Sequence, residues 1–214
     1  ILISMYTVKE MFYTIQGEGV HTGRPAVFLR FAGCNLWSGL EKDRESAICN
    51  FCDTDFVGTD GEGGGKFESA ESLAHDAKSI WPDSAYSNPF VVCTGGEPLL
   101  QIDKDFIDAF HKEAFKIAIE TNGTIMPPHG IDWICVSPKI GSDLIVTSGD
   151  ELKLVYPQLD CDPAQFEHLD FDHFSLQPMD GPNREKNTKK TLSYCRQHPH
   201  WRVSLQIHKF LGIP

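Results

Sequence analysis

Short apolar runs rich in β-branched and aromatic residues alternate along this chain with longer segments whose apolar residues recur at helical spacing. Runs of the first kind are typical of buried strands, and segments of the second kind are typical of amphipathic helices. The pattern predicts eight strands, at Val8–Tyr13, Ala26–Ala32, Phe90–Thr94, Phe115–Glu120, Ile131–Val136, Glu151–Val155, His173–Gln177 and Arg202–His208. It also predicts three helices, at Ser69–Trp81, Asp103–Ala114 and Asn183–Gln197.

The first two predicted helices begin with residues that favour a helix start. Ser69 is a suitable N-cap because its side-chain oxygen can accept a hydrogen bond from the first turn. Asp103 and Asp105 place negative charge in the first turn of the second helix, where the helix dipole favours it. The residues expected to face inward are Leu73, Ala77 and Ile80, then Phe106, Ile107 and Phe110, and finally Leu192 and Cys195.

The order of these elements predicts an α/β fold. Repeated strand–helix units imply parallel strands joined by right-handed crossovers. Polar, glycine-rich or proline-containing turns follow several strands, and in parallel folds such turns carry the reactive groups. A full eight-unit barrel takes about 250 residues, so the 214 residues predict a partial TIM-like (β/α)6 barrel forming one domain over residues 1–214.

Composition and charge narrow the function. The formal net charge of −11 argues against non-specific nucleic-acid binding, which needs a basic face. No apolar run is long enough to cross a membrane, and Ile1–Met5 lacks the basic start of a signal peptide. Seven unevenly spaced cysteines favour a reducing compartment, so we expect a cytoplasmic protein.

The segment Gly58–Lys66 is the one low-complexity stretch. It resembles a phosphate-binding loop superficially, but no Ser or Thr follows Lys66 and no helix begins there. We therefore expect a flexible surface loop.

The segment Phe31–Thr54 gathers three cysteines directly behind a predicted strand: Cys34, Cys49 and Cys52. Three thiolates with a fourth ligand such as His21 could hold a structural zinc ion. Three cysteines could equally hold an iron–sulfur cluster and leave one iron open to a small molecule. The spacing does not decide between the two. The other four cysteines, Cys93, Cys135, Cys161 and Cys195, are expected to be structural.

A second motif, Cys93–Leu100, ends the predicted strand Phe90–Thr94 with the sequence CTGGEPLL. Its two glycines allow backbone to approach a ligand closely, and Glu97 adds a carboxylate beside them. A plain turn between strand and helix would not explain two glycines and an acid together.

The cysteine loop and the GGEP turn together resemble radical S-adenosylmethionine enzymes. The resemblance implies that Cys34, Cys49 and Cys52 bind a [4Fe-4S] cluster, and that Gly96 and Glu97 help to hold S-adenosylmethionine on its open iron. The spacing C-x14-C-x2-C departs from the usual C-x3-C-x2-C of that superfamily. The residues Ser38–Ser46 within it are polar and are expected to form a surface excursion, because loop closure costs little more as a loop lengthens.

Further segments resemble one family within that superfamily, the 7-carboxy-7-deazaguanine synthases. They are TIQGEG at Thr14–Gly19, Arg30 before FAGC, CDT at Cys52–Thr54, ETNGT at Glu120–Thr124, SPK at Ser137–Lys139, QPMDG at Gln177–Gly181 and the terminal HKFLGIP. The resemblance runs from about Tyr6 to Pro214. It implies action on 6-carboxy-5,6,7,8-tetrahydropterin in 7-deazapurine (queuosine) biosynthesis.

The reaction implied by this resemblance begins with a 5′-deoxyadenosyl radical that takes a hydrogen atom from C6 of the pterin. Ring contraction and loss of ammonia then give 7-carboxy-7-deazaguanine, so the enzyme would be a carbon–nitrogen lyase. No protein side chain is expected to be catalytic, because the cofactor performs the hard step.

The resemblance also assigns roles to individual residues. The implied cofactor-binding residues are Phe51, Cys52, Asp53, Gly96, Glu97, Ser137, Pro138, Lys139, Gln177, Pro178, Met179 and Asp180. The implied substrate-binding residues are Ile15, Gln16, Gly17, Glu18, Arg30, Thr94, His208 and Pro214. Arg30 suits the pterin carboxylate, because a guanidinium binds a carboxylate through two parallel hydrogen bonds.

The family also uses Mg²⁺, which prefers oxygen ligands, and Thr54 matches its metal-ligand position. The implied partners are a reducing protein of the flavodoxin or ferredoxin type and a second copy of the chain in a homodimer. Two alternatives remain from the sequence: a radical S-adenosylmethionine enzyme that activates a glycyl-radical protein, and a non-catalytic zinc-binding module.

Overall fold

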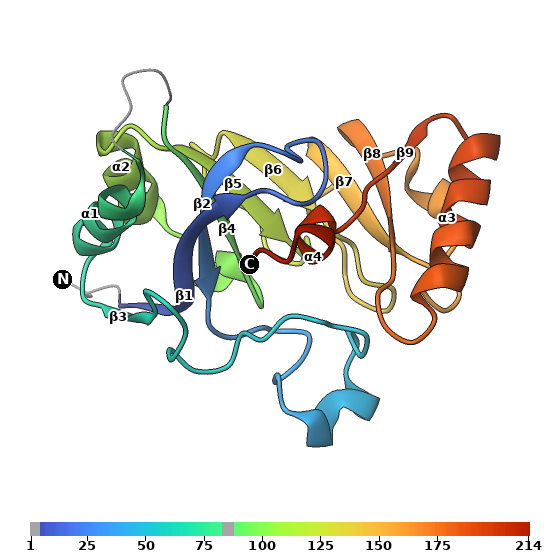
Figure 1. Cartoon of the computed structure of the whole chain (residues 1–214), viewed down its shortest axis with the longest axis horizontal. Coiled ribbons are helices and arrows are strands. Elements are labelled where there is room, and N and C mark those ends of the chain that lie inside the picture. Colours follow the sequence, from blue (N-terminus) through green and yellow to red (C-terminus); the bar gives the residue numbers. More distant parts are fainter. Residues whose placement is uncertain (1–4, 83–87) are drawn as a thin grey trace.

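One nine-stranded sheet extends through the computed structural model, which describes residues 5–82 and 88–214 (Figure 1). Its strands are β1 (Tyr6–Ile15), β2 (Pro25–Phe31), β3 (Gly65–Phe67), β4 (Phe90–Gly95), β5 (Lys116–Thr121), β6 (Trp133–Val136), β7 (Ser148–Tyr156), β8 (Asp170–Pro178) and β9 (Trp201–Val203). They lie in the order β3-β1-β2-β4-β5-β6-β7-β8-β9.

The predicted α/β fold with a largely parallel sheet is confirmed. Neighbouring strands from β2 to β9 are all parallel. The first predicted strand differs, because β1 runs antiparallel to both β2 and β3. Among the described residues, no pairing joins the two end strands β3 and β9, so the strand order is that of an open sheet.

Three longer helices flank the sheet: α1 (Ala70–Ile80), α2 (Lys104–Lys112) and α3 (Arg184–Gln197). Helices α1 and α2 lie together beside one end of the sheet, and α3 lies beside the other (Figure 1). The predicted N-cap Ser69 is confirmed, because its Oγ accepts from Ser72 N at 3.1 Å. In α2, Asp105 lies in the first turn as predicted, and Asp103 is the N-cap, with its Oδ1 accepting from Phe106 N at 2.9 Å. Between β5 and β8 the chain passes through β6 and β7. The connections between these strands, over the described residues 122–169, are loops and the short helix η3 (Pro163–Phe166), with no α-helix.

The core has two parts. The first lies between α1, α2 and the strands β1, β2, β4 and β5, and the second between β6–β9, η3 and α3. The prediction of inward-facing residues in α2 is confirmed, since Phe106, Ile107 and Phe110 are buried.

Two predicted inward contacts are wrong. Ile80 is 37% exposed and Leu192 is 45% exposed. In α3 the buried positions are instead Asn187 and Thr191, because Asn187 donates to the carbonyl of Met179 and Thr191 donates to the carbonyl of Asn187. The Asn187 bond joins the helix to the segment after β8, whereas the Thr191 bond lies within the helix.

The predicted strand Arg202–His208 is also largely wrong. Strand β9 ends at Val203, and the chain then leaves the sheet to form the short helix α4 (Ile207–Leu211). The apolar–polar alternation of this segment has no buried face, since Val203 and Leu205 are each 37% exposed. The N–H of Ile207 donates instead to the carbonyl of Gly17, which brings α4 to the end of β1 (2.9 Å).

The segment 58–66 joins the sheet. Its last two residues belong to β3, and Gly61 N and Glu62 O form hydrogen bonds with β1. Residues 1–4, within the segment tested for a signal peptide, lie outside the described residues. Of the described helices, none has the length and apolar character needed to span a membrane.

We predict that two leucines on helices contribute very differently to stability. Leu73→Ala removes a fully buried side chain of α1 and is expected to lower the free energy of unfolding by about 2–5 kcal/mol. The matched change Leu192→Ala in α3 is expected to cost less than about 1 kcal/mol. Urea unfolding of both variants measures the difference, and equal losses would contradict this account of the core.

Candidate active site

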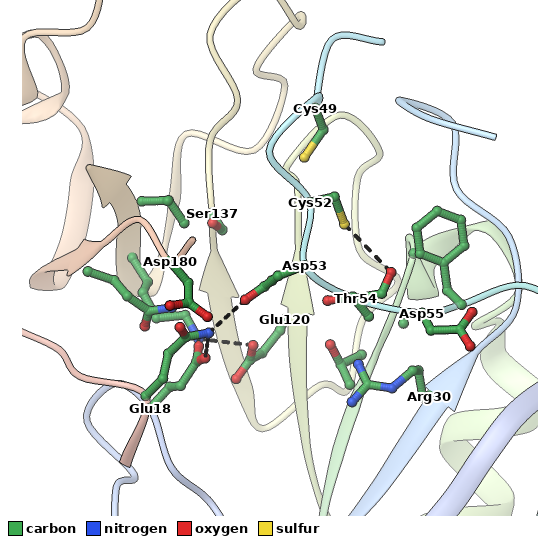
Figure 2. Close-up of a pocket in the computed structure, with 18 of the residues that line it drawn as sticks. Glu18, Arg30, Cys49, Cys52, Asp53, Thr54, Asp55, Glu120, Ser137 and Asp180 are labelled. Atoms are coloured by element: carbon green, nitrogen blue, oxygen red, sulfur yellow. Dashed lines mark hydrogen bonds and ion pairs between the residues drawn. The ribbon is translucent and has the colours of Figure 1, made fainter. Parts of the chain in front are cut away.

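A cavity of about 350 Å³ lies at the carboxyl ends of the parallel strands. All but two of the residues singled out in the sequence line it: Ile15, Gln16, Gly17, Glu18, Arg30, Cys34, Cys49, Phe51, Cys52, Asp53, Thr54, Thr94, Gly96, Ser137, Lys139, Gln177, Pro178, Met179, Asp180, His208 and Pro214. Figure 2 shows Cys49 and Cys52 at one end of this space and Glu18, Glu120 and Arg30 at the other.

The three loop cysteines line this cavity as free thiols. Leu36 N donates to the sulfur of Cys34 at 3.4 Å. Cys49 and Cys52 are hydrogen-bonded partners, which lowers the pKa of Cys52 and raises that of Cys49. Within residues 5–82 and 88–214, no three His, Cys, Asp or Glu side chains form a group able to hold one metal ion.

The glycine turn after β4 lies against the cysteine loop. A Cβ atom on Gly96 would stand 2.1 Å from the carbonyl oxygen of Gly33 and 2.6 Å from Cβ of Cys34. Gly95 has φ +138°, which L side chains rarely adopt, and its Cβ would also meet the backbone of Phe31. Glycine is therefore required at both positions for this turn to approach the loop.

Glu97 is not among the residues that line the cavity, and its assignment to the cofactor stays a prediction. It is fully buried, and its carboxylate accepts hydrogen bonds from Leu99 N, Asn122 N and Thr121 Oγ1 at 2.8–3.0 Å. Burial raises its pKa. The Glu97 side chain thus links the turn after β4 to the end of β5. Pro138 also lies off the cavity, with its carbonyl accepting from Gln158.

The cavity end near β1 contains a buried ion-pair network. Lys153 Nζ lies 2.6 Å from Glu18 Oε2 and 2.9 Å from Glu120 Oε2, and the Gln16 amide donates to Glu120. Burial alone would lower the pKa of Lys153, but Glu120 and Glu18 more than offset this and raise it. The same pairing lowers the pKa of Glu18. These contacts hold the side chains of the network in place.

Helix α4 closes one wall through Lys209. Its Nζ lies 2.7 Å from Asp53 Oδ2 and 2.6 Å from Asp180 Oδ2, so one side chain joins the cysteine loop to the turn after β8. Lys209 lowers the pKa of Asp180. Beyond the helix, the Pro214 carbonyl accepts from Thr14 Oγ1 at 3.0 Å.

Arg30 reaches the cavity from β2, beneath the segment that carries Thr54 (Figure 2). Its Nε donates to Glu10 Oε1 at 2.6 Å. Among the described residues its two terminal nitrogens have no protein partner, so they are available to an anion. Nearby, Lys9 pairs with Asp55 and Asp60 at 2.9 and 2.7 Å.

Several cavity residues were missed in the sequence, and four of them carry the polar contacts described above: Glu120, Lys153, Gln206 and Lys209. A signal existed for two of them. Glu120 stands in the ETNGT motif at the end of β5, and Lys153 interrupts an otherwise apolar strand. Gln206 lies within the predicted strand Arg202–His208 and Lys209 directly follows it, so the short helix that turns both side chains toward Asp53 was not expected.

The chain was compared with known proteins. No family model matches it. Three proteins named 7-carboxy-7-deazaguanine synthase are similar to it along nearly their whole length. The relative from Bradyrhizobium diazoefficiens is 60% identical over 208 residues, covering 97% of this chain and 99% of that protein. The one from Burkholderia multivorans is 58% identical over 209 residues (98% and 99%), and the one from Bacteroides thetaiotaomicron is 41% identical over 209 residues (98% and 99%).

A solved structure agrees. The crystal structure of QueE from Escherichia coli matches with a TM-score of 0.66 and 26% sequence identity, covering 94% of this chain and 93% of that one. Sequence and structure thus lead to one group of enzymes, and the chain belongs to the 7-carboxy-7-deazaguanine synthase family.

Proposed function

We propose that the cavity at the carboxyl edge of the sheet is where this chain carries out the activity of its family. That activity is the formation of 7-carboxy-7-deazaguanine, in 7-deazapurine (queuosine) biosynthesis. The observation that carries the proposal is that three thiols, a glycine turn, a free guanidinium end and a fixed carboxylate network line the same cavity.

The donor set fits a [4Fe-4S] cluster with S-adenosylmethionine bound to it. Cys34, Cys49 and Cys52 offer sulfur ligands from one loop, and Gly96, which also lines the cavity, lets the turn after β4 pack directly against that loop. A structural zinc ion takes four protein ligands, whereas three cysteines suffice for a cluster that leaves one iron open to a small molecule. When bound, the reduced cluster and S-adenosylmethionine supply a radical able to abstract hydrogen.

The chain's own residues orient the substrate, 6-carboxy-5,6,7,8-tetrahydropterin. The free end of Arg30 suits the carboxylate, and Gln16, Glu18 and Glu120 suit the amine and amide edge of the pterin. Lys153 pairs with both glutamates and holds them in place, so they can accept hydrogen bonds without rearranging. His208 and Pro214 border the same space.

Lys209 has a positioning role in this proposal. It ties Asp53, next to a cluster ligand, to Asp180, in a segment assigned to the cofactor. Because His208 precedes it on α4, the same contacts fix one substrate-binding wall against the cofactor side. Positioning of this kind is the main contribution that the protein makes when a cofactor performs the chemistry.

We also infer a Mg²⁺ ion held by Thr54, which lines the cavity close to Arg30. A single neutral hydroxyl is a weak ligand, so oxygens of the substrate carboxylate complete the site. A reducing protein of the flavodoxin or ferredoxin type and a homodimer are inferred from family membership. The successive parallel strands from β2 and β4 to β9 support a partial barrel of the radical S-adenosylmethionine type in one domain, although the (β/α)6 repeat lacks α-helices between β5 and β8 over the described residues 122–169.

Anaerobic turnover tests the function directly. Reconstituted protein with the tetrahydropterin, S-adenosylmethionine, a strong reductant and Mg²⁺ is expected to give 7-carboxy-7-deazaguanine and one equivalent of ammonia, measured by mass spectrometry and ammonia assay. A colourless protein that contains one zinc and no sulfide would refute the cluster. An intact cluster without deazaguanine product would refute the substrate.

We predict that Arg30→Lys weakens substrate use without loss of the cluster. A lysine keeps the charge but cannot form two parallel hydrogen bonds to a carboxylate. Losing a charged hydrogen bond costs about 1.5–3 kcal/mol, so kcat/KM should fall roughly 10- to 150-fold, mainly through KM. Arg202→Lys, on exposed β9, is the matched control. Unchanged kinetics in Arg30→Lys, with iron content equal to the parent, would exclude Arg30 as the carboxylate ligand.

We predict that Thr54→Val weakens the response to Mg²⁺. Valine has nearly the same shape but lacks the oxygen that a hard cation needs. The Mg²⁺ concentration for half-maximal activity should rise about tenfold or more, as for the loss of one metal contact. Thr54→Ser retains the hydroxyl and should respond like the parent. If valine and serine titrate alike, Thr54 is not a ligand.

A further inference from the structure

The excursion between Cys34 and Cys49 is attached to the cysteine loop by one side chain. In the sequence this stretch is an anomaly, with eleven residues more than the usual spacing. In the structure it forms the 3-10 helix η1 (Glu41–Ser46), which projects from the body of the molecule (Figure 1). None of its residues is buried. Position alone would suggest a solvated loop without a role.

Arg44 contradicts that view, because it points back from η1 to the C-x-x-C segment. Its Nη1 donates to two backbone carbonyls, those of Asn50 at 2.9 Å and Cys52 at 3.0 Å. Its Nε and Nη2 donate to the two carboxylate oxygens of Glu41 at 2.8 and 2.6 Å. The guanidinium is thus oriented by its bidentate ion pair with Glu41 and binds the backbone of the cysteine loop with its remaining N–H groups.

The aromatic side chains below Arg44 anchor it to the fold. Its guanidinium carbon lies 4.0 Å from the ring centre of Trp37, a geometry that favours a cation over an aromatic face. Trp37 is buried, donates to the Leu40 carbonyl and meets the buried ring of Phe56 edge-on at 5.6 Å. Both rings line the cavity. An arginine pair on the surface alone would contribute little, but this one is stacked on the core.

The same set of contacts reaches the first cysteine. Cys34 accepts from the N–H of Leu36, the neighbour of Trp37. A continuous path therefore leads from the Cys34 sulfur through Trp37 and Arg44 to the Cys52 carbonyl. Two separated parts of the ligand loop are held relative to each other by contacts that the excursion itself supplies.

We propose that Arg44 is a positioning residue that holds the Cys49–Cys52 segment in its ligand-binding conformation and keeps a permanent positive charge beside it. This inference rests on the proposed role of the three cysteines as cluster ligands. A nearby positive charge favours the reduced, more negative cluster, so Arg44 should raise the reduction potential. The long insertion between Cys34 and Cys49 then serves to hold the ligand-binding part of the loop in place.

Three variants separate charge from geometry. Arg44→Gln removes the charge and the fork, and Arg44→Lys keeps the charge but cannot bind Glu41 and two carbonyls at once. Lys42→Gln is the matched control, because Lys42 is exposed on the same short helix and has no bonded partner among the described residues. Thermal unfolding of all three, expected to match the parent within a few degrees, shows that they fold.

The first measurement uses iron-free protein and is independent of the cluster. Hydrogen–deuterium exchange of amides in residues 49–54 should be about tenfold faster in both Arg44 variants than in the parent, since charged hydrogen bonds to the loop are lost. Lys42→Gln should exchange like the parent. Equal exchange in Arg44→Gln and Lys42→Gln would overturn the positioning role.

The second measurement uses reconstituted protein. Iron and sulfide content after gel filtration should fall in Arg44→Gln, and an EPR-monitored titration should give it a lower reduction potential, while Arg44→Lys keeps the potential of the parent. A potential in Arg44→Lys as low as in Arg44→Gln would overturn the charge effect. If the parent itself binds no iron, the proposed function fails, while the exchange data still decide whether Arg44 braces the loop.

Discussion

The buried carboxylate of Glu97 is the constraint on which the cavity depends. A carboxylate without solvent is costly unless hydrogen bonds satisfy it, and this one accepts three, from Leu99, Thr121 and Asn122. They tie the turn after β4 to the end of β5. The N–H of Glu97 also donates to Gly33 at 3.0 Å, so the cysteine loop after β2 joins the same frame. Three adjacent strand ends are thereby fixed by one residue.

Lysines complete the enclosure from the opposite side. Lys153 joins strand β7 to the segment after β1 and to the end of β5, and Lys209 joins α4 to two loops. Such pairs gain little net stability, because desolvation offsets much of their attraction. The contribution of these ion pairs is geometric, since they hold polar and charged side chains at fixed positions around a substrate with several polar groups. A rigid, preorganised cavity is what radical chemistry requires of its host.

Two separate sets of contacts hold the cysteine loop, one near the sheet and one away from it. Near the sheet, the glycines after β4 let its backbone approach within van der Waals distance. Away from the sheet, Arg44 and Trp37 hold its outer half. A loop of this length would otherwise be free to sample many conformations, and each ordered residue costs conformational entropy. The contacts of Arg44 with Trp37 and with the loop backbone offset part of this entropy cost.

The sequence by itself determined the α/β class, the N-cap of α1, the buried face of α2 and most of the motif residues that line the cavity, because these follow from local spacing and from motifs at strand ends. Only the tertiary structure decided that Glu97 turns inward, that residues 207–211 form a helix, and that Lys153 and Lys209 face the cavity. The physical reason is distance along the chain. Lys209 and Asp53 lie 156 residues apart, and no local pattern encodes a partner that only the folded sheet brings near.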